Sequence, residues 1–370
     1  MPIAEHPQRL ALGNELHARP FIDVDAPQRV SHIAMLSDGD GASEIAHLLQ
    51  LCRRFDVAQP PEDAIHYTGD FGSFRLKWER HTEFTTYTFL RGGVFRDPFE
   101  DTAIELVPEP WLDALPGERI VAAHLSVRPP GDTPDARTEL ANLFVMESLC
   151  HGSMLGGTAL VTTDFRIHAD GFARILVQDR ALSPRQAGRL VQRLLEVETY
   201  RNMAMLSLPL AREASPLVRR IGQSLFQLTA EMKSLSSVEA ERSLLDELTN
   251  VSAEIEESIA LTSYRFSATK AYTTLIAERT AELGEEPVED FPMLGSFVER
   301  RFAPAVRTCD SIAQRQLSLS ERATRAANLL RTRVDIKLEA QNRDLLASMD
   351  RRARLQLRLQ QTVEGLSVVA

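Results

Sequence analysis

Clusters of histidine and carboxylate side chains are the part of this sequence whose residue types could do chemistry. Glu79, His81 and Glu83 alternate along the chain, so on one continuous strand they would share a face. Imidazole nitrogens and carboxylate oxygens are groups that bind divalent metal ions. If the chain instead turns at residues 80–82 to form a hairpin, the three side chains no longer align, and they are then explained as salt-bridging groups.

A second cluster has the same alternating pattern, and a third lies near the N-terminus. Asp164, Arg166, His168 and Asp170 run along one strand edge and end at Asp170-Gly171, a strong hairpin signal. Without a ligand, these residues are explained as paired charges on a solvated strand face. The third cluster comprises Asn14, Glu15, His17 and Arg19.

These clusters predict a cation site only if folding brings them together. The five residues that would form such a site are His17, His81, Glu83, Asp164 and His168. A divalent cation is the one cofactor that the sequence suggests, and spacing along the chain does not show whether the clusters converge.

Established catalytic templates are missing from the sequence. It contains no G-x-x-x-x-G-K-[ST], G-x-G-x-x-G, H-E-x-x-H or G-x-S-x-G pattern. Cys150 and His151 are neighbours in the chain, and adjacent residues seldom meet in hydrogen-bonding geometry. An enzyme is therefore disfavoured, and a metal-dependent hydrolase ranks third among the possible functions.

Length and composition predict two folded domains in a reducing compartment. A chain of 370 residues exceeds the usual size of one hydrophobic core. The three cysteines are odd in number and lack C-x-x-C spacing, which argues against a disulfide framework or a zinc ribbon. A net charge of −10 argues against nucleic acid as the main partner.

The elements that must position these clusters differ between the two parts of the chain. Before residue 183, short runs rich in Val, Ile, Thr and aromatic residues predict strands, and helical spacing predicts helices over 42–55 and 135–146. The fold class is therefore α+β, with a mixed α/β head domain at residues 1–183. The predicted strands are Arg29–Leu36, Phe74–Trp78, Phe84–Leu90, Ile120–Val127, Ala159–Ile167 and Phe172–Val177.

After Ser183-Pro184, an N-cap and first-turn pair, the pattern is helical throughout. The predicted helices are 184–211, 216–235, 238–283 and 293–366, with Pro304 either kinking the last one or lying in its first turns. Helices this long must pack against neighbouring helices or subunits. We therefore expect a long-helix domain over residues 184–370.

The last predicted helix carries a heptad-like seam, which predicts a homo-oligomer. Its apolar members alternate with polar ones of the kind that set coiled-coil register. A kinked helix that packs within its own monomer is the alternative. The seam consists of Leu338, Asn342, Leu345, Met349, Arg352, Gln356, Leu359 and Val363.

The sequence near the C-terminus predicts a membrane segment after Ala370. Five arginines stand against two aspartates between residues 343 and 358, and residues 365–370 are then largely apolar. A basic flank before an apolar run is typical of the cytoplasmic side of a transmembrane helix, here that of a bacterial inner membrane. The alternative is a frayed terminus with a solvated basic face. No window of 18 apolar residues occurs in the sequence itself.

Five stretches of the chain resemble a bacterial family of unknown function, the domain family numbered 3422. They are NELHARPF (14–21), RVSHIAML (29–36), KWERHTEFTTYTF (77–89), TDFRIHADGFARILVQDR (163–180) and LLRTRVDIKLEAQNRDLLASMDRRARLQLRLQQTVEGLSVVA (329–370). The resemblance implies a membrane-anchored protein that continues into hydrophobic segments. It implies nothing about activity.

The architecture is also similar, more weakly, to CorA-type divalent-cation channels, which join an α/β cytosolic domain to a long stalk helix. The leading hypothesis is accordingly the cytosolic part of a membrane-anchored homo-oligomer that conducts or gates divalent cations. A membrane-associated helical scaffold without transport activity is the main alternative, because fold similarity alone is a weak guide to function.

Overall fold

The protein folds into two compact units that each combine separate stretches of the chain. The computed structural model describes residues 5–9, 13, 20–37, 41–131, 136–235 and 237–367. Unit 1 comprises Met1–Leu206 with Ala268–Val306, and unit 2 comprises Ser207–Ser267 with Arg307–Ala370. This division differs from the expected one at residue 183, because the first long helix and residues 268–306 pack with the sheet.

Unit 1 is built on a mixed sheet with nine strands among the described residues, in the order β2-β3-β4-β1-β5-β8-β7-β6-β9. β5 and β8 pair in parallel, and the other described strand pairs are antiparallel. The strands are β1 (Gln28–Leu36), β2 (His66–Asp70), β3 (Arg75–Arg80), β4 (Phe84–Gly92), β5 (Glu118–Arg128), β6 (Cys150–Met154), β7 (Ala159–Ile167), β8 (Ala173–Asp179) and β9 (Glu286–Pro287).

Helices cover both faces of this sheet, and alternation along each strand assigns side chains to one face or the other. On β4, Tyr87 and Phe89 pack with the apolar residues of α2, whereas Leu90 packs with those of α5. The helices of unit 1 are α2 (Gly41–Arg54), α3 (Glu109–Asp113), α4 (Ala136–Leu143), α5 (Pro184–Met205), α8 (Leu294–Arg301) and the end of α7 (Val238–Glu282). Two 3₁₀ turns lie at Ala103–Leu106 and Met146–Ser148.

The α+β prediction is confirmed, and every strand predicted from alternation is present. The sequence did not predict β2, β6 and β9. β2 and β9 are the edge strands and bury few side chains, and β6, although buried, carries Gly152 and Ser153 in place of β-branched residues, so the apolar signal of all three is weak.

Helix α5 begins where the sequence predicts it. Ser183 accepts a hydrogen bond from the Gln186 backbone N–H, and the Gln186 side chain accepts one from the Ser183 N–H, which forms a capping box. Pro184 occupies the first turn, where no backbone donor is needed. This cap fixes the start of the helix that covers one face of the sheet.

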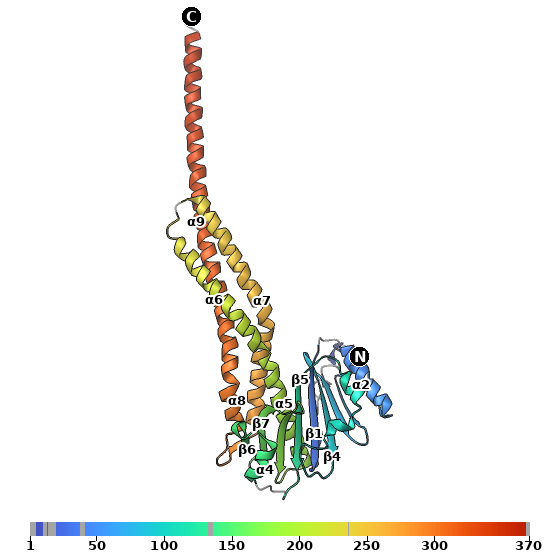
Figure 1. Cartoon of the computed structure of the whole chain (residues 1–370). Helices are drawn as coiled ribbons and strands as arrows, with labels where there is room; N and C mark the ends of the chain where they lie inside the picture. Colours follow the sequence, from blue (N-terminus) through green and yellow to red (C-terminus); the bar gives the residue numbers. More distant parts are fainter. Residues whose placement is uncertain are drawn as a thin grey trace. The chain divides into compact units, whose positions relative to one another are not determined.

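Unit 2 is a three-helix bundle of α6 (Ser207–Glu231), the first part of α7 and α9 (Ala303–Ser367). Glu241 of α7 is within 2.8 Å of Lys337 of α9, and further along α7 Thr262 bonds Gln316, so these two helices are antiparallel. A buried apolar cluster from all three helices forms the core. Figure 1 shows α9 continuing past the turn that joins α6 and α7.

The structure corrects two helix boundaries. The break expected at Ser215-Pro216 is wrong: it lies at Leu206, and α6 runs through Pro216. The last predicted helix is divided at Phe302 into α8 and α9, with Pro304 in the first turn of α9, where its missing N–H costs no helical hydrogen bond. None of the helices in the described ranges is both long and apolar enough to cross a bilayer.

Candidate functional site

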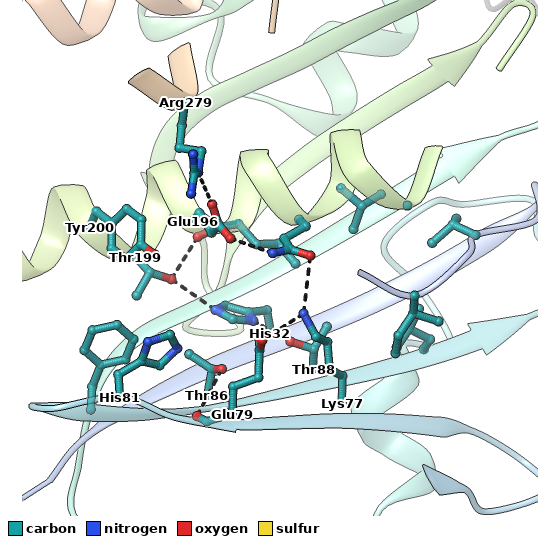
Figure 2. A pocket seen from close by; sticks show the side chains of 18 residues that line it. His32, Lys77, Glu79, His81, Thr86, Thr88, Glu196, Thr199, Tyr200 and Arg279 are labelled. Carbon is teal, nitrogen blue, oxygen red and sulfur yellow. Dashed lines mark hydrogen bonds and ion pairs between the residues drawn. The ribbon is translucent and has the colours of Figure 1, made fainter. Parts of the chain in front are cut away.

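A cavity of about 340 Å³ lies between α5 and the sheet, within unit 1. Its floor is made by His32 of β1 and by alternate residues of β3 and β4, and its roof by one side of α5 (Figure 2). Cavities that hold small ligands start at about this volume, roughly 300 Å³. The lining residues used below are His32, Lys77, Glu79, Thr86, Thr88, Gln192, Glu196, Thr199 and Arg279.

A chain of polar contacts crosses the cavity from roof to floor. Arg279 of α7 forms an ion pair with Glu196, which accepts a hydrogen bond from the Gln192 amide at 2.7 Å. The Gln192 carbonyl accepts from the Lys77 ammonium at 3.4 Å, and Lys77 pairs with Glu79 at 3.0 Å. Burial alone would lower the pKa of Arg279, but the hydrogen bond and charge of Glu196 raise it, so the guanidinium stays charged.

Lys77 is the most unusual of these residues, because its charged side chain is only 8% exposed. Lysine is rarely buried unless it is paired. An ammonium has three N–H donors, and within the described chain two of them are used, by Glu79 and Gln192. The remaining donor is suited to a negatively charged or carbonyl oxygen in the cavity.

His32 of β1 is neutral and fixed in one tautomer. The Thr199 hydroxyl donates to the Leu195 carbonyl at 2.8 Å, so it accepts from His32 Nε2–H at 3.1 Å. His32 Nδ1 then accepts from the Thr88 hydroxyl at 2.8 Å. Desolvation by burial, with smaller effects of Lys77 and His81, lowers the pKa of His32 to about 3. His32 therefore positions two threonines rather than carrying charge.

The two ends of the cavity differ in character. One end is apolar and is lined by Ile22, Val24, Leu90 and Val191, and the other is lined by Phe84, His81 and Tyr200. Gly188 of α5 allows the apolar end to close, since a Cβ there would lie 2.1 Å from the Ile22 carbonyl oxygen. The cavity can thus hold a molecule with a charged centre and an apolar body.

The structure has the hairpin, not the continuous strand, at Glu79, His81 and Glu83. β3 ends at Arg80 and β4 starts at Phe84, and the His81 N–H donates to the Phe84 carbonyl at 2.8 Å. The His81 ring stacks on Phe84 at 4.3 Å, and Glu83 accepts from the Tyr272 hydroxyl at 2.6 Å. Glu79 and His81 line the cavity, but the three side chains do not form one metal-binding face.

Asp164 lies in a strained bulge of β7, and His168 directly follows that strand. Phe165 has φ +54°, a conformation that bulky residues rarely adopt. The fully buried Asp164 carboxylate accepts from the Val145 and Arg166 backbone N–H groups and pairs with His168 at 3.0 Å. These contacts give the buried Asp164 carboxylate a structural role, because they stabilise the bulge.

The convergence of the clusters that a cation site would require is not found among the described residues. β3 and β7 are separated in the sheet by β4, β1, β5 and β8, a distance of roughly 24 Å at about 4.8 Å per strand. His81 and Glu83 therefore cannot share an ion with Asp164 and His168. Within the described residues, no group of three or more His, Cys, Asp or Glu side chains is placed to hold a metal ion. His17, with the rest of the N-terminal cluster, lies outside those residues.

The three cysteines are free and buried. Burial, with a smaller effect of the nearby Glu285, raises the pKa of Cys150 to about 12, so its thiol is protonated at neutral pH. The neighbouring His151 ring bonds the Thr162 hydroxyl at 2.7 Å. Cys150 and His151 do not form a nucleophile and base pair.

The predicted seam lies on the part of α9 that carries few buried side chains. Leu338 is half-buried, whereas Leu345, Met349 and Leu359 are 59–68% exposed. Asn342, Arg352 and Gln356 are also exposed, and the side chain of Val363 lies outside the described residues. The seam is therefore unpaired within this chain over its described part.

Sequence reasoning missed the residues that line the cavity, although two signals point to them. Lys77 and Glu79 alternate with the apolar Leu76 and Trp78 on β3, and Thr86 and Thr88 alternate with Tyr87 and Phe89 on β4, at positions that face a helix. On α5, Gln192, Glu196 and Thr199 follow one another at helical spacing on a side that also carries buried leucines. Polar residues repeated on the buried side of two facing elements indicate a polar cavity between them.

Comparison with known proteins gives one match. A family model described as "Protein of unknown function (DUF3422)" matches residues 4–370. No curated protein and no solved structure matches the chain.

Proposed function

We propose that the cavity beneath α5 binds a small polar molecule and that the protein acts as a homo-oligomeric ligand-binding protein at a membrane. The chain belongs to the DUF3422 family of proteins of unknown function. The observation that carries the ligand-binding part is the buried Lys77 ammonium, which faces a cavity of about 340 Å³. Burying a charge is costly, and such groups cluster at functional sites.

Native mass spectrometry of the purified chain tests the ligand-binding part. We expect a retained small molecule that is lost in the Lys77→Met variant, because the ammonium donor is removed while the length of the side chain is kept. Lys270→Met, the same change on an exposed position of α7, is the matched control and should retain the molecule. If neither the wild type nor the control retains any molecule, and a library of polar metabolites does not raise the melting temperature, the cavity is not a ligand site.

A second observation supports the homo-oligomer. Leu345, Met349 and Leu359 repeat at heptad-like spacing on one side of α9 and are largely exposed. A second copy of the same chain offers an identical seam, in which the polar Asn342 and Gln356 would set the register. Exposed leucines in such a repeat favour association with another helix.

Light scattering on the purified chain tests the homo-oligomer. Leu345→Glu is expected to convert an oligomer to a monomer. Ala347→Glu is the matched control, because two residues along a helix correspond to about 200° around its axis. A wild-type chain that is monomeric at micromolar concentration, or equal loss of mass in both variants, would overturn this part of the proposal.

Membrane anchoring remains a proposal that the charge of α9 supports. The arginines at 343, 351, 352, 354 and 358 belong to one helix, and clustered arginines are attracted to anionic lipid. Fractionation of cells that express the natural open reading frame tests it, and recovery of the product in the soluble fraction would contradict it.

Divalent-cation transport is the most specific form of the proposal, and it is supported only by the combination of an α/β unit and a long helix. Uptake of Mg²⁺ or Co²⁺ into liposomes that contain the full-length product tests it. Partner binding without any uptake would favour the helical scaffold instead.

A further inference from the structure

The charges that line the cavity balance. Lys77 and Arg279 carry positive charge, Glu79 and Glu196 carry negative charge, and burial keeps His32 neutral, with its pKa lowered to about 3. A ligand with a single charge would leave the occupied cavity with a net charge of one. A ligand that carries both charges is complementary to this lining.

Lys77 and Glu196, the two hydrogen-bond partners of the Gln192 side chain, can each form further hydrogen bonds. Lys77 has one N–H donor beyond those that contact Glu79 and Gln192 in the described chain. The Glu196 carboxylate accepts from Gln192 and from Arg279, and a carboxylate has about four acceptor positions. A ligand carboxylate therefore fits at Lys77, and a ligand ammonium fits at Glu196.

The Gln192 amide sets the distance between these two groups. Its oxygen accepts from Lys77 at 3.4 Å, and its nitrogen donates to Glu196 at 2.7 Å. The amide oxygen and nitrogen are about 2.3 Å apart, so the ammonium and the carboxylate lie at most about 8 Å apart. A ligand with two charged groups about 3 Å apart can span this distance through two charge-assisted hydrogen bonds of about 2.8 Å. That spacing corresponds to an amino group and a carboxylate on the same carbon.

We propose that this cavity binds an α-amino acid with an apolar side chain. The ligand carboxylate contacts Lys77, the ligand ammonium contacts Glu196, and the side chain extends toward the apolar end at Val24 and Val191. Thr88 and Thr199 flank the charged centre and are oriented by His32. This assignment rests on the proposed function, since it names the class of molecule that the same cavity holds.

Isothermal titration of the 370-residue chain tests the assignment, with L-leucine as the probe. Two analogues each lack one charge: 4-methylpentanoate has no amino group, and 3-methylbutylamine has no carboxylate. A third, 5-aminopentanoate, keeps both charges but separates them. Each analogue is expected to bind at least about 10-fold more weakly than L-leucine, because a hydrogen bond to a charged group is lost or misplaced.

Two variants give a crossed pattern that damage to the fold would not produce. Lys77→Met should weaken L-leucine binding about 10-fold or more and leave 3-methylbutylamine binding unchanged, because the amine does not use Lys77. Glu196→Gln should weaken binding of both L-leucine and 3-methylbutylamine and leave 4-methylpentanoate binding unchanged. Lys270→Met is the control and should leave all affinities unchanged.

The amino-acid assignment is overturned if L-leucine, L-valine and L-phenylalanine all fail to bind, or if the single-charge analogues bind as tightly as L-leucine. Native mass spectrometry separates this failure from failure of the proposed function. A retained molecule of another class would contradict the amino acid while leaving the cavity a ligand site.

Discussion

Acidification should destabilise unit 1 through His32. The unfolded chain takes up a proton at this residue as the pH falls through its ordinary pKa of 6.5, whereas the folded chain does so only near pH 3. The stability that His32 contributes is therefore fully present above pH 6.5 and is lost as the pH falls toward 3. Between pH 7 and pH 5, this one group lowers the free energy of unfolding by about 2 kcal/mol.

Urea unfolding at pH 7 and pH 5 measures this effect, with tryptophan fluorescence as the signal. Both tryptophans, Trp78 and Trp111, are buried in unit 1 with His32, so the signal reports the correct unit. The loss on going to pH 5 should be about 2 kcal/mol smaller in His32→Asn than in the wild type, because other titrating groups cancel in the comparison.

Thr88→Val is the control for this experiment. It removes a hydrogen bond of His32 at 2.8 Å and keeps the titrating ring, so it should lower stability at both pH values without changing the difference between them. Equal pH dependence in the wild type and His32→Asn would refute the conclusion that the buried ring stays neutral. NMR of the folded chain gives a second measurement, since the His32 ring should not titrate between pH 7 and pH 5.

Three further outcomes follow from the structure. Gly188→Ala should lower the free energy of unfolding by about 2 kcal/mol, because the added Cβ would clash with the Ile22 carbonyl. Gly222→Ala, whose added Cβ has its nearest neighbour at 3.6 Å, should raise the free energy of unfolding by up to about 1 kcal/mol. Urea unfolding measures both changes. Gln316→Leu should destabilise unit 2 by about 1–3 kcal/mol, because the Ser258 hydroxyl loses its partner; calorimetry should show that Ser258→Ala in the same chain recovers part of this loss. Cys150 should resist iodoacetamide at pH 8 and react in urea, as mass spectrometry would detect, because burial raises the pKa of its thiol to about 12.

Local pattern was sufficient to predict much of the fold. Short runs rich in Val, Ile, Thr and aromatic residues, bounded by turn residues, predicted β1, β3, β4, β5, β7 and β8, because such side chains favour the extended backbone. The Ser183-Pro184 pair predicted the start of α5, because both residues act within one turn of helix. The 45-residue α7 was also predicted to within one residue, since its helical spacing is uninterrupted.

The pairing of distant strands and helices determined which side chains lie close together, and the sequence pattern did not predict this. Whether Glu79, His81 and Glu83 share a face depends on a turn, and whether they meet Asp164 depends on strand order, which places four strands between them. The same order brings Lys77 of β3 beneath Gln192 of α5, residues 115 positions apart in the chain. Side chains so distant in sequence leave no shared local pattern, because their proximity arises only when the helix packs on the sheet. The cavity is thus a property of the tertiary structure, whereas the elements that form its walls are readable in the sequence.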